Sequence, residues 1–205
     1  GSNVDLFRLV NERGTEVSIT NLGAKIEQIL VPDRHGTVQD VVLGYDTIDA
    51  VIDGHPSMNA FIGRYANRIG GARFTLDATT YQLGANSGRN TLHGGIRGSR
   101  HQVFEARQLS PRAVEMRYVF GDGEEGFPGT LPVRIVYALD DDDALTLQWS
   151  ATARDKATVA SFTGHAFFNL TGDPRTSVEG HSLTLDADRF LPIDGESLPT
   201  GEWRH

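Results

Sequence analysis

Two histidines lie in glycine-containing segments that interrupt the regular pattern of the sequence. His93 precedes two glycines in residues 90–95, and His165 opens an aromatic run in residues 164–170. Imidazole is the side chain that most often gives or takes a proton near neutral pH, so both histidines are candidate general acids or bases. Taken separately, each histidine is more simply interpreted as structural. His93 would be a histidine in a turn whose hydrogen-bonding groups have partners, and His165 would be a partly buried core residue.

Residues 63–70 carry side chains suited to binding sugar hydroxyls. Asn67 offers both a donor and an acceptor, and Arg68 offers a fork of donors. Sugars present hydroxyl groups that need such paired partners. The alternative interpretation of this segment is a surface loop held by a salt bridge.

Residues 122–129 contain two neighbouring carboxylates, Glu124 and Glu125, of the type used in acid–base chemistry. Their setting beside a Gly-Phe-Pro-Gly frame favours a different role. It predicts a rigid loop that buries one aromatic side chain, Phe127, so we interpret the segment as structural.

The sequence does not predict a metal site. His93 and His165 have no third ligand at a suitable spacing. Four aspartates at 140–143 are interpreted as a solvated hairpin tip, because metal-binding loops need spaced, converging ligands. A further polar cluster is interpreted as a solvated loop: Asp49, Asp53 and His55.

Composition excludes several classes of function. The chain has 205 residues and a formal net charge of −8 without a basic stripe, which disfavours binding to nucleic acids and to anionic membranes. No apolar run approaches the roughly 18 residues of a membrane span. The chain has no cysteine, so disulfides and thiolate metal sites are excluded. We expect a cytoplasmic protein, with the periplasm left open because Gly1 and Ser2 resemble a tag remnant.

Short runs of alternating polar and apolar residues dominate the chain and predict an all-β, antiparallel fold in one domain over residues 1–205. The clearest hairpin joins residues 135–138 to 145–149. One short helix is expected over 46–51, capped by Asp46 and stopped by Gly54. Strands are expected at residues 16–20, 25–31, 38–43, 73–76, 102–108, 113–120, 133–139, 145–153, 157–162 and 182–186.

Five blocks of the sequence, taken in their order, resemble the aldose 1-epimerase (galactose mutarotase) family. The blocks are residues 40–44, 63–69, 92–95, 126–129 and 165–170. No single block is diagnostic, whereas the ordered set is strongly so. The likeness runs from about residue 5 to the end of the chain, and it outweighs the structural interpretations of the two histidines.

The resemblance implies a large antiparallel β-sandwich of the galactose-mutarotase type, with the sugar on a concave sheet face. It implies interconversion of the α and β anomers of a free aldose, glucose or galactose, without a cofactor. Asn67 and Arg68 match the family's substrate-binding pair. His93 matches a histidine that contacts the sugar, and His165 matches the general acid, so these two form the expected catalytic pair.

The sequence departs from the family at its C-terminal end. Family members are longer, and the glutamate that serves as their base lies in a block with no match here. Glu202 lies in a Pro-Thr-Gly-Glu turn and is not expected to replace that base, and Gly164 stands where many members carry asparagine. We therefore expect a C-terminally incomplete sandwich with little activity of its own, whose exposed sheet edges favour self-association.

Two other functions remain open. One is a non-catalytic carbohydrate-binding β-sandwich that keeps the sugar contacts without the base. The other is an epimerase-like protein acting on a hexose 6-phosphate, for which Arg64 and Arg97 are available as phosphate ligands.

Overall fold

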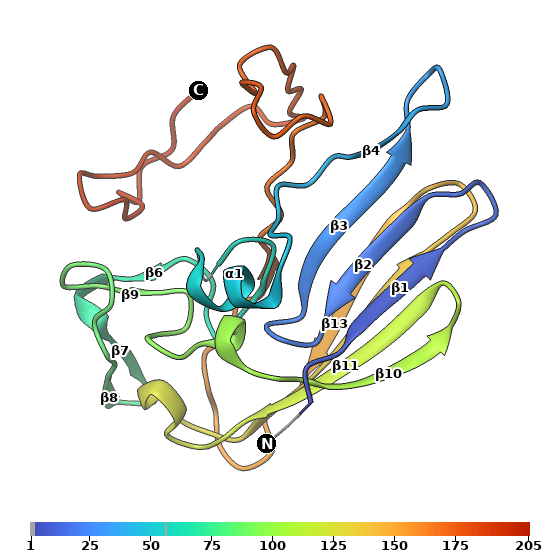
Figure 1. Cartoon of the computed structure of the whole chain (residues 1–205). Coiled ribbons are helices and arrows are strands. Elements are labelled where there is room, and N and C mark those ends of the chain that lie inside the picture. The colour runs from blue at the N-terminus through green and yellow to red at the C-terminus, as the bar shows by residue number, and fades with distance from the viewer. Residues whose placement is uncertain (1–2, 56) are drawn as a thin grey trace.

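Two antiparallel four-stranded sheets form the body of the protein (Figure 1). The computed structural model describes residues 3–55 and 57–205. The first sheet has the order β1-β2-β3-β4, with strands β1 Leu6–Val10, β2 Glu16–Thr20, β3 Lys25–Pro32 and β4 Val38–Asp40. The second has the order β10-β11-β12-β13, with strands β10 Glu105–Ser110, β11 Ala113–Phe120, β12 Leu131–Leu139 and β13 Leu145–Ala151.

The two sheets enclose a shared core because each strand alternates apolar and polar side chains. Val17 and Ile19 of β2 are fully buried in the same cluster as Met116 of β11 and Ile135 of β12. The hydroxyl of Tyr137, also buried there, donates to the carbonyl oxygen of Ala24 and so links the two sheets. Each such apolar side chain contributes about 1.5–3 kcal/mol on burial. The predicted all-β antiparallel sandwich is therefore confirmed.

Smaller elements surround this body. Three two-stranded pairings, β14-β5, β6-β9 and β7-β8, lie in the connections. Within residues 3–55 and 57–205, no helix has the length and apolar character needed to span a membrane. The elements are α1 Ile48–Asp53, β5 Phe61–Ile62, β6 Arg68–Ile69, β7 Arg73–Leu76, β8 Thr79–Gln82, β9 Thr91–Leu92, β14 Thr163–Gly164, and the 3₁₀ turns η1 Gly70–Ala72, η2 Ser99–His101 and η3 Glu124–Gly126.

Where the alternation is strong, the predicted elements match the observed ones. The hairpin of β12 and β13 turns at residues 140–143 as predicted. Strands β2, β7 and β11 have the predicted bounds. Helix α1 ends at Gly54 as expected, but its cap is Thr47 and not Asp46, because the Thr47 side chain accepts from the Ala50 N–H.

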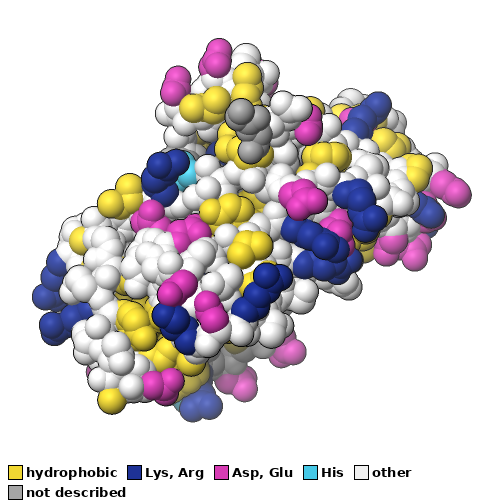
Figure 2. Space-filling view, turned by 90° about the horizontal axis from the view of Figure 1, so that it is seen from below, with side chains coloured by type: hydrophobic (Ala, Val, Ile, Leu, Met, Phe, Trp, Pro, Cys, Tyr) yellow, Lys and Arg dark blue, Asp and Glu magenta, His cyan; other side chains and the backbone are white. Residues whose placement is uncertain are grey.

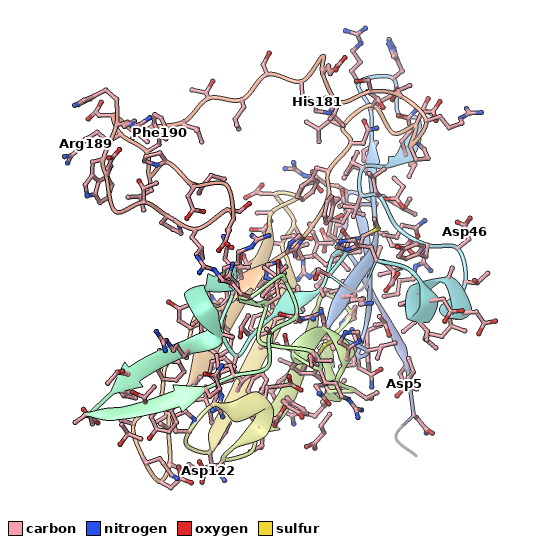
Figure 3. All side chains as sticks on the ribbon, turned by 90° about the vertical axis from the view of Figure 1, so that its left-hand side faces the viewer. Asp5, Asp46, Asp122, His181, Arg189 and Phe190 are labelled. Carbon is pink, nitrogen blue, oxygen red and sulfur yellow. The ribbon has the colours of Figure 1, made fainter. Side chains whose placement is uncertain are left out.

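Two predicted strands, residues 157–162 and 182–186, are wrong. Apart from a parallel bridge between Tyr65 and Ser161, neither segment has a strand partner among the described residues. An alternating sequence gives a strand only where a neighbour supplies hydrogen bonds. After β14, residues 165–169 bond to the 41–43 segment through a bridge between Val42 and Phe168. Beyond them the chain continues as a tail that runs away from the two sheets and carries Arg189 and Phe190 (Figures 1 and 3).

Surface charges of both signs are intermixed on the face shown in Figure 2. On the outer side of the second sheet, Glu115 is paired with Arg107, Arg117 and Arg134 from the same three-stranded region. Carboxylates thus neutralise part of the basic charge even where arginines gather. This agrees with the lack of a basic stripe in the sequence.

Candidate functional site

His93 and His165 meet in one pocket of ≈ 320 Å³. Their ring centroids lie 5.0 Å apart, and the ring planes are nearly perpendicular, at 87°. Two imidazoles at this separation can contact the same bound molecule. The pocket is lined by His55, Ser57, Asn86, Leu92, His93, Arg100, His165 and Phe167.

His93 is fixed by a reciprocal pair of hydrogen bonds with Asn67. Strand β6 pairs with β9 so that Arg68 stands opposite Leu92, which brings residues 67 and 93 side by side. The His93 N–H donates to the Asn67 carbonyl oxygen at 3.0 Å, and the Asn67 N–H donates to His93 Nδ1 at 3.1 Å. Because Nδ1 accepts, the neutral ring carries its proton on Nε2. His93 therefore presents an N–H donor to a ligand.

The two glycines after His93 are required by the backbone geometry. Gly94 and Gly95 have φ values of 79° and 103°, a region that L side chains rarely adopt. A Cβ atom at Gly94 would lie 2.1 Å from the carbonyl oxygen of Gly63. The loop that carries His93 can pack against the Gly63 segment only because this position has no side chain.

The surroundings of His93 keep its imidazole neutral. Burial is the main cause, and it lowers the pKa of His93 from 6.5 to about 4. Positive charge nearby adds to the effect, from His165, Arg100, Arg68 and His55 in that order. At neutral pH, His93 is a hydrogen-bond donor through Nε2–H and not a cation.

His165 is held by backbone pairing on the segment that follows β13. Strand β14 is antiparallel to β5, with Gly164 opposite Phe61. One residue later, the carbonyl oxygen of His165 accepts from the Asn59 N–H at 3.0 Å. The Phe167 ring lies 5.1 Å from the His165 ring, centroid to centroid, and also lines the pocket. Pairing with the core strand β5 thus sets where His165 lies.

Asn59 completes the support of the His165 segment. Its φ of 57° is left-handed, a conformation that asparagine tolerates better than most residues. The side chain is buried, with 3% exposure. Its Oδ1 accepts from the Phe167 N–H at 3.0 Å, and its Nδ2 donates to the Leu43 carbonyl oxygen at 2.6 Å. Asn59 therefore binds the chain on both sides of Ala166.

Asn67 and Arg68 lie beside the pocket, not among its lining residues. Arg68 Nη1 donates to Asn67 Oδ1 at 3.3 Å, so the two side chains are in contact. Arg68 Nε is buried without a partner among the described residues. The fold therefore gathers the four expected site residues: the two histidines face the pocket and the Asn67–Arg68 pair adjoins His93.

Several pocket residues are missed by sequence reasoning. His55 belongs to the cluster interpreted as a solvated loop; it is exposed, yet it lines the pocket, with its ring edge-on to Phe167 at 6.2 Å. Asn86 donates to the carbonyl oxygens of Leu92 and Gly95 and so braces the His93 loop. No local motif marks these residues, because long-range pairing brings them together.

Of the two arginines considered for phosphate binding, Arg64 is engaged elsewhere. Arg64 is 1% exposed, and its guanidinium donates to the carbonyl oxygens of Pro128 and Gly129 at 2.8 and 2.6 Å. Arg97 is exposed and does not line the pocket. The availability of Arg64 for a phosphate, assumed from the sequence, is therefore wrong.

The carboxylates of residues 122–129 serve the backbone, as predicted. Glu124 accepts from the Gly121 N–H at 2.8 Å, and Glu125 accepts from the N–H groups of Ile96 and Arg97 at 2.8 and 3.1 Å. Phe127 is fully buried, also as predicted.

The described residues place no carboxylate in the lining of the pocket. Within the same part of the chain, no three His, Asp or Glu side chains are grouped so that they could hold a metal ion. Glu202 is paired with Arg204 at 2.8 Å in the tail. The pocket thus offers imidazole, amide and hydroxyl groups together with the Arg100 guanidinium.

Comparisons with known proteins agree on one family. The aldose 1-epimerase family model matches residues 5–205. The chain is 40% identical to the galactose mutarotase of Bos taurus over 199 residues and 34% identical to the aldose 1-epimerase of Escherichia coli K12 over 194 residues. It covers 57% and 56% of these two relatives, so it spans a little over half their length.

Solved structures show the same fold. A GalM/aldose epimerase homologue from C. elegans matches 98% of the chain with a TM-score of 0.88 and 27% identity, and the match covers 61% of that protein. A galactose 1-epimerase from Lactobacillus acidophilus NCFM matches 98% of the chain with a TM-score of 0.81 and 23% identity, covering 62% of that protein. The fold is therefore of the galactose-mutarotase type.

Proposed function

Because the chain belongs to the aldose 1-epimerase family, we propose that it supplies the sugar contacts and the acid of a site that interconverts the α and β anomers of a free aldose. Galactose and glucose are the proposed substrates, in keeping with relatives named galactose mutarotase and aldose 1-epimerase. The observation that carries this proposal is the pair of imidazoles 5.0 Å apart in one pocket.

The proposed reaction opens and recloses the sugar ring. His165 donates a proton to the ring oxygen as the bond from that oxygen to C1 breaks, while a base takes the proton of the C1 hydroxyl and a C1 carbonyl forms. Rotation about C1–C2 and the reverse transfers close the ring on the other face. Each well-placed acid or base typically contributes about 10²–10⁴-fold to the rate. His165 recovers its proton on closure.

The other residues hold the sugar in place for this transfer. We assign the His93 Nε2–H as a donor to a sugar oxygen, because Nδ1 is already bonded to the Asn67 N–H. Asn67 and Arg68 orient the ring relative to His165, which is a positioning effect. The base is proposed to be a glutamate from outside this chain, since no carboxylate of the described residues lines the pocket.

A titration of the chain with D-galactose and D-glucose, followed by NMR of the histidine side chains, tests this proposal. We expect the His93 and His165 signals to shift with one common Kd. His93→Ala and His165→Ala should each weaken binding about tenfold, the effect of losing one net hydrogen bond of about 1.4 kcal/mol. His35→Ala, in the exposed 33–37 turn, is the control. Equal weakening by the control, or sugar binding that leaves both imidazole signals unchanged, would refute the proposal.

The lack of a carboxylate among the described lining residues favours one second candidate: a carbohydrate-binding sandwich without catalysis. Because the proposed base lies outside this chain, polarimetry on freshly dissolved α-D-galactose separates the two when acetate is added as a carboxylate base. Binding without acceleration under these conditions favours the second candidate. Acceleration that disappears in His165→Ala favours the epimerase, and acceleration that survives this change rules out His165 as the acid.

A further inference from the structure

Arg100 is a buried cation that holds the loop carrying His93. It is 6% exposed and lines the same pocket as the two histidines. Its Nη1 donates to the His93 carbonyl oxygen at 2.5 Å, and its Nη2 donates to the Gly95 carbonyl oxygen at 2.7 Å. One planar guanidinium thus binds the backbone on both sides of Gly94.

This contact matters because the loop is conformationally costly. His93, Gly94 and Gly95 have consecutive positive φ values of 53°, 79° and 103°. Such a run persists only where the surroundings hold it, because a left-handed backbone is strained for the non-glycine residue. A fork of two parallel donors suits two carbonyl groups that converge from one loop.

A second charge binds the next residues of the same loop. Glu125 accepts from the N–H groups of Ile96 and Arg97. Burial lowers the pKa of Arg100, and the negative charge of Glu125 opposes that effect. The loop is therefore held at its carbonyls by a cation and at its amides by an anion.

We propose that Arg100 is a positioning residue for His93: its guanidinium fixes the loop that presents the imidazole to a ligand. The inference rests on the proposed function only in assigning His93 to the sugar. The contacts themselves are independent of the ligand.

Several charged and titratable groups around His93 affect its pKa, and Arg100 is one of them. Burial lowers the pKa of His93, and His165, Arg100, Arg68 and His55 lower it further. Arg68 reaches His93 from the neighbouring strand β6, and His165 and His55 come from other segments of the pocket. Arg100 is the member of this set that also bonds to the His93 backbone.

Two substitutions separate the charge of Arg100 from its geometry. Arg100→Gln removes the charge and keeps an amide donor, whereas Arg100→Lys keeps the charge and loses the fork. We expect the titration midpoint of His93, followed by NMR, to rise in Arg100→Gln and to stay near the wild-type value in Arg100→Lys, because the nearby positive charge of Arg100 disfavours the imidazolium. Both variants should bind galactose about tenfold more weakly, because both lose the double contact to the loop.

Arg97→Gln is the matched control, since it removes the same charge from the same loop and Arg97 lies outside the lining of the pocket. It should leave both the His93 titration and galactose affinity unchanged. A His93 midpoint that is the same in Arg100→Gln and wild type, or that rises equally in Arg97→Gln, overturns the inference. If the wild-type chain binds no aldose, the proposed function fails, and the His93 titrations still test Arg100.

Discussion

At the scale of single residues, one hydrogen bond decides the role of His93. Its Nδ1 accepts from the Asn67 N–H, so the proton of the neutral ring lies on Nε2. The depressed pKa of about 4 keeps the ring in this form at neutral pH. A neutral donor can bind a sugar oxygen without adding a charge to the pocket.

This predicts a specific pH dependence of sugar binding. Galactose affinity should change little from pH 7 down to about 5 on account of His93, and protonation of the imidazole should begin to change it as the pH approaches 4. Calorimetric titrations over this range check the prediction, with His93→Gln as the comparison, because an amide donor does not titrate there. A His93-dependent transition near pH 6.5 would contradict the depressed pKa.

The same shift has a consequence for stability. A histidine whose folded-state pKa lies below its unfolded value binds fewer protons when folded, so stability falls as the pH drops from about 6.5 towards 4. The linkage limit for this shift is about 3 kcal/mol, and partial exposure of the ring reduces it. The effect is absent above the unfolded pKa.

At the scale of elements, the His165 segment depends on one side chain. Asn59 accepts from the Phe167 N–H and donates to the Leu43 carbonyl oxygen, although it lies outside every strand. Its left-handed backbone means that glycine could replace it without strain. The contribution of the side chain can therefore be measured apart from the backbone.

We predict that Asn59→Gly costs about 1–3 kcal/mol of unfolding free energy, because the part-buried Phe167 N–H and Leu43 carbonyl group lose their partner. Urea denaturation measures this cost, and hydrogen exchange should show faster exchange of the Phe167 amide. Ser197→Gly is the control, as another left-handed residue, in the exposed tail. Unchanged exchange at Phe167 would show that Asn59 does not hold the segment.

The elements also show how far the sequence alone leads. Strands β2, β7 and β11 are predicted with their bounds because both partners and the alternation are local. Residues 157–162 and 182–186 have a similar pattern but no sheet to join among the described residues. The alternation of polar and apolar residues predicts that a segment favours the strand conformation. Whether the segment forms a strand depends on a neighbouring strand that can pair with it.

The site was predictable to a similar degree. His93, His165, Asn67 and Arg68 lie in recognisable blocks, and the fold brings them together. Arg100, Asn59 and His55 could not be found from local sequence, because their contacts with the histidine segments are created by tertiary packing. A residue that supports a site residue through tertiary contacts carries no recognisable motif in the local sequence.

At the scale of the whole molecule, much apolar surface remains open to solvent in the tail. Leu183 and Leu185 are 83% and 71% exposed, and Trp203 is 62% exposed. The tail carries only short bridges, between Phe190 and Arg204 and between Ile193 and Pro199. Exposed apolar groups of this kind favour association.

We therefore predict that the chain self-associates as its concentration rises, in part through the tail. The double substitution Leu183→Lys and Leu185→Lys should reduce association measured by sedimentation velocity, with no loss of the folded core. Ser182→Lys with Thr184→Lys adds the same charge at the alternate positions and should reduce it less. If both double substitutions reduce association equally, the added charge alone causes the reduction, and the apolar side chains of the tail do not drive association.

The reciprocal bonds between Asn67 and His93 also bear on how such a site could be transplanted or diversified. Each segment supplies a backbone group that the other needs, and the Gly94 position must remain bare for the Gly63 segment to approach. The two blocks thus form one structural unit. If residues 92–95 were grafted into another β-sandwich, residues 63–68 would have to be moved with them. A library of variants that changes one block alone would mostly contain proteins in which His93 lacks its hydrogen bonds to Asn67.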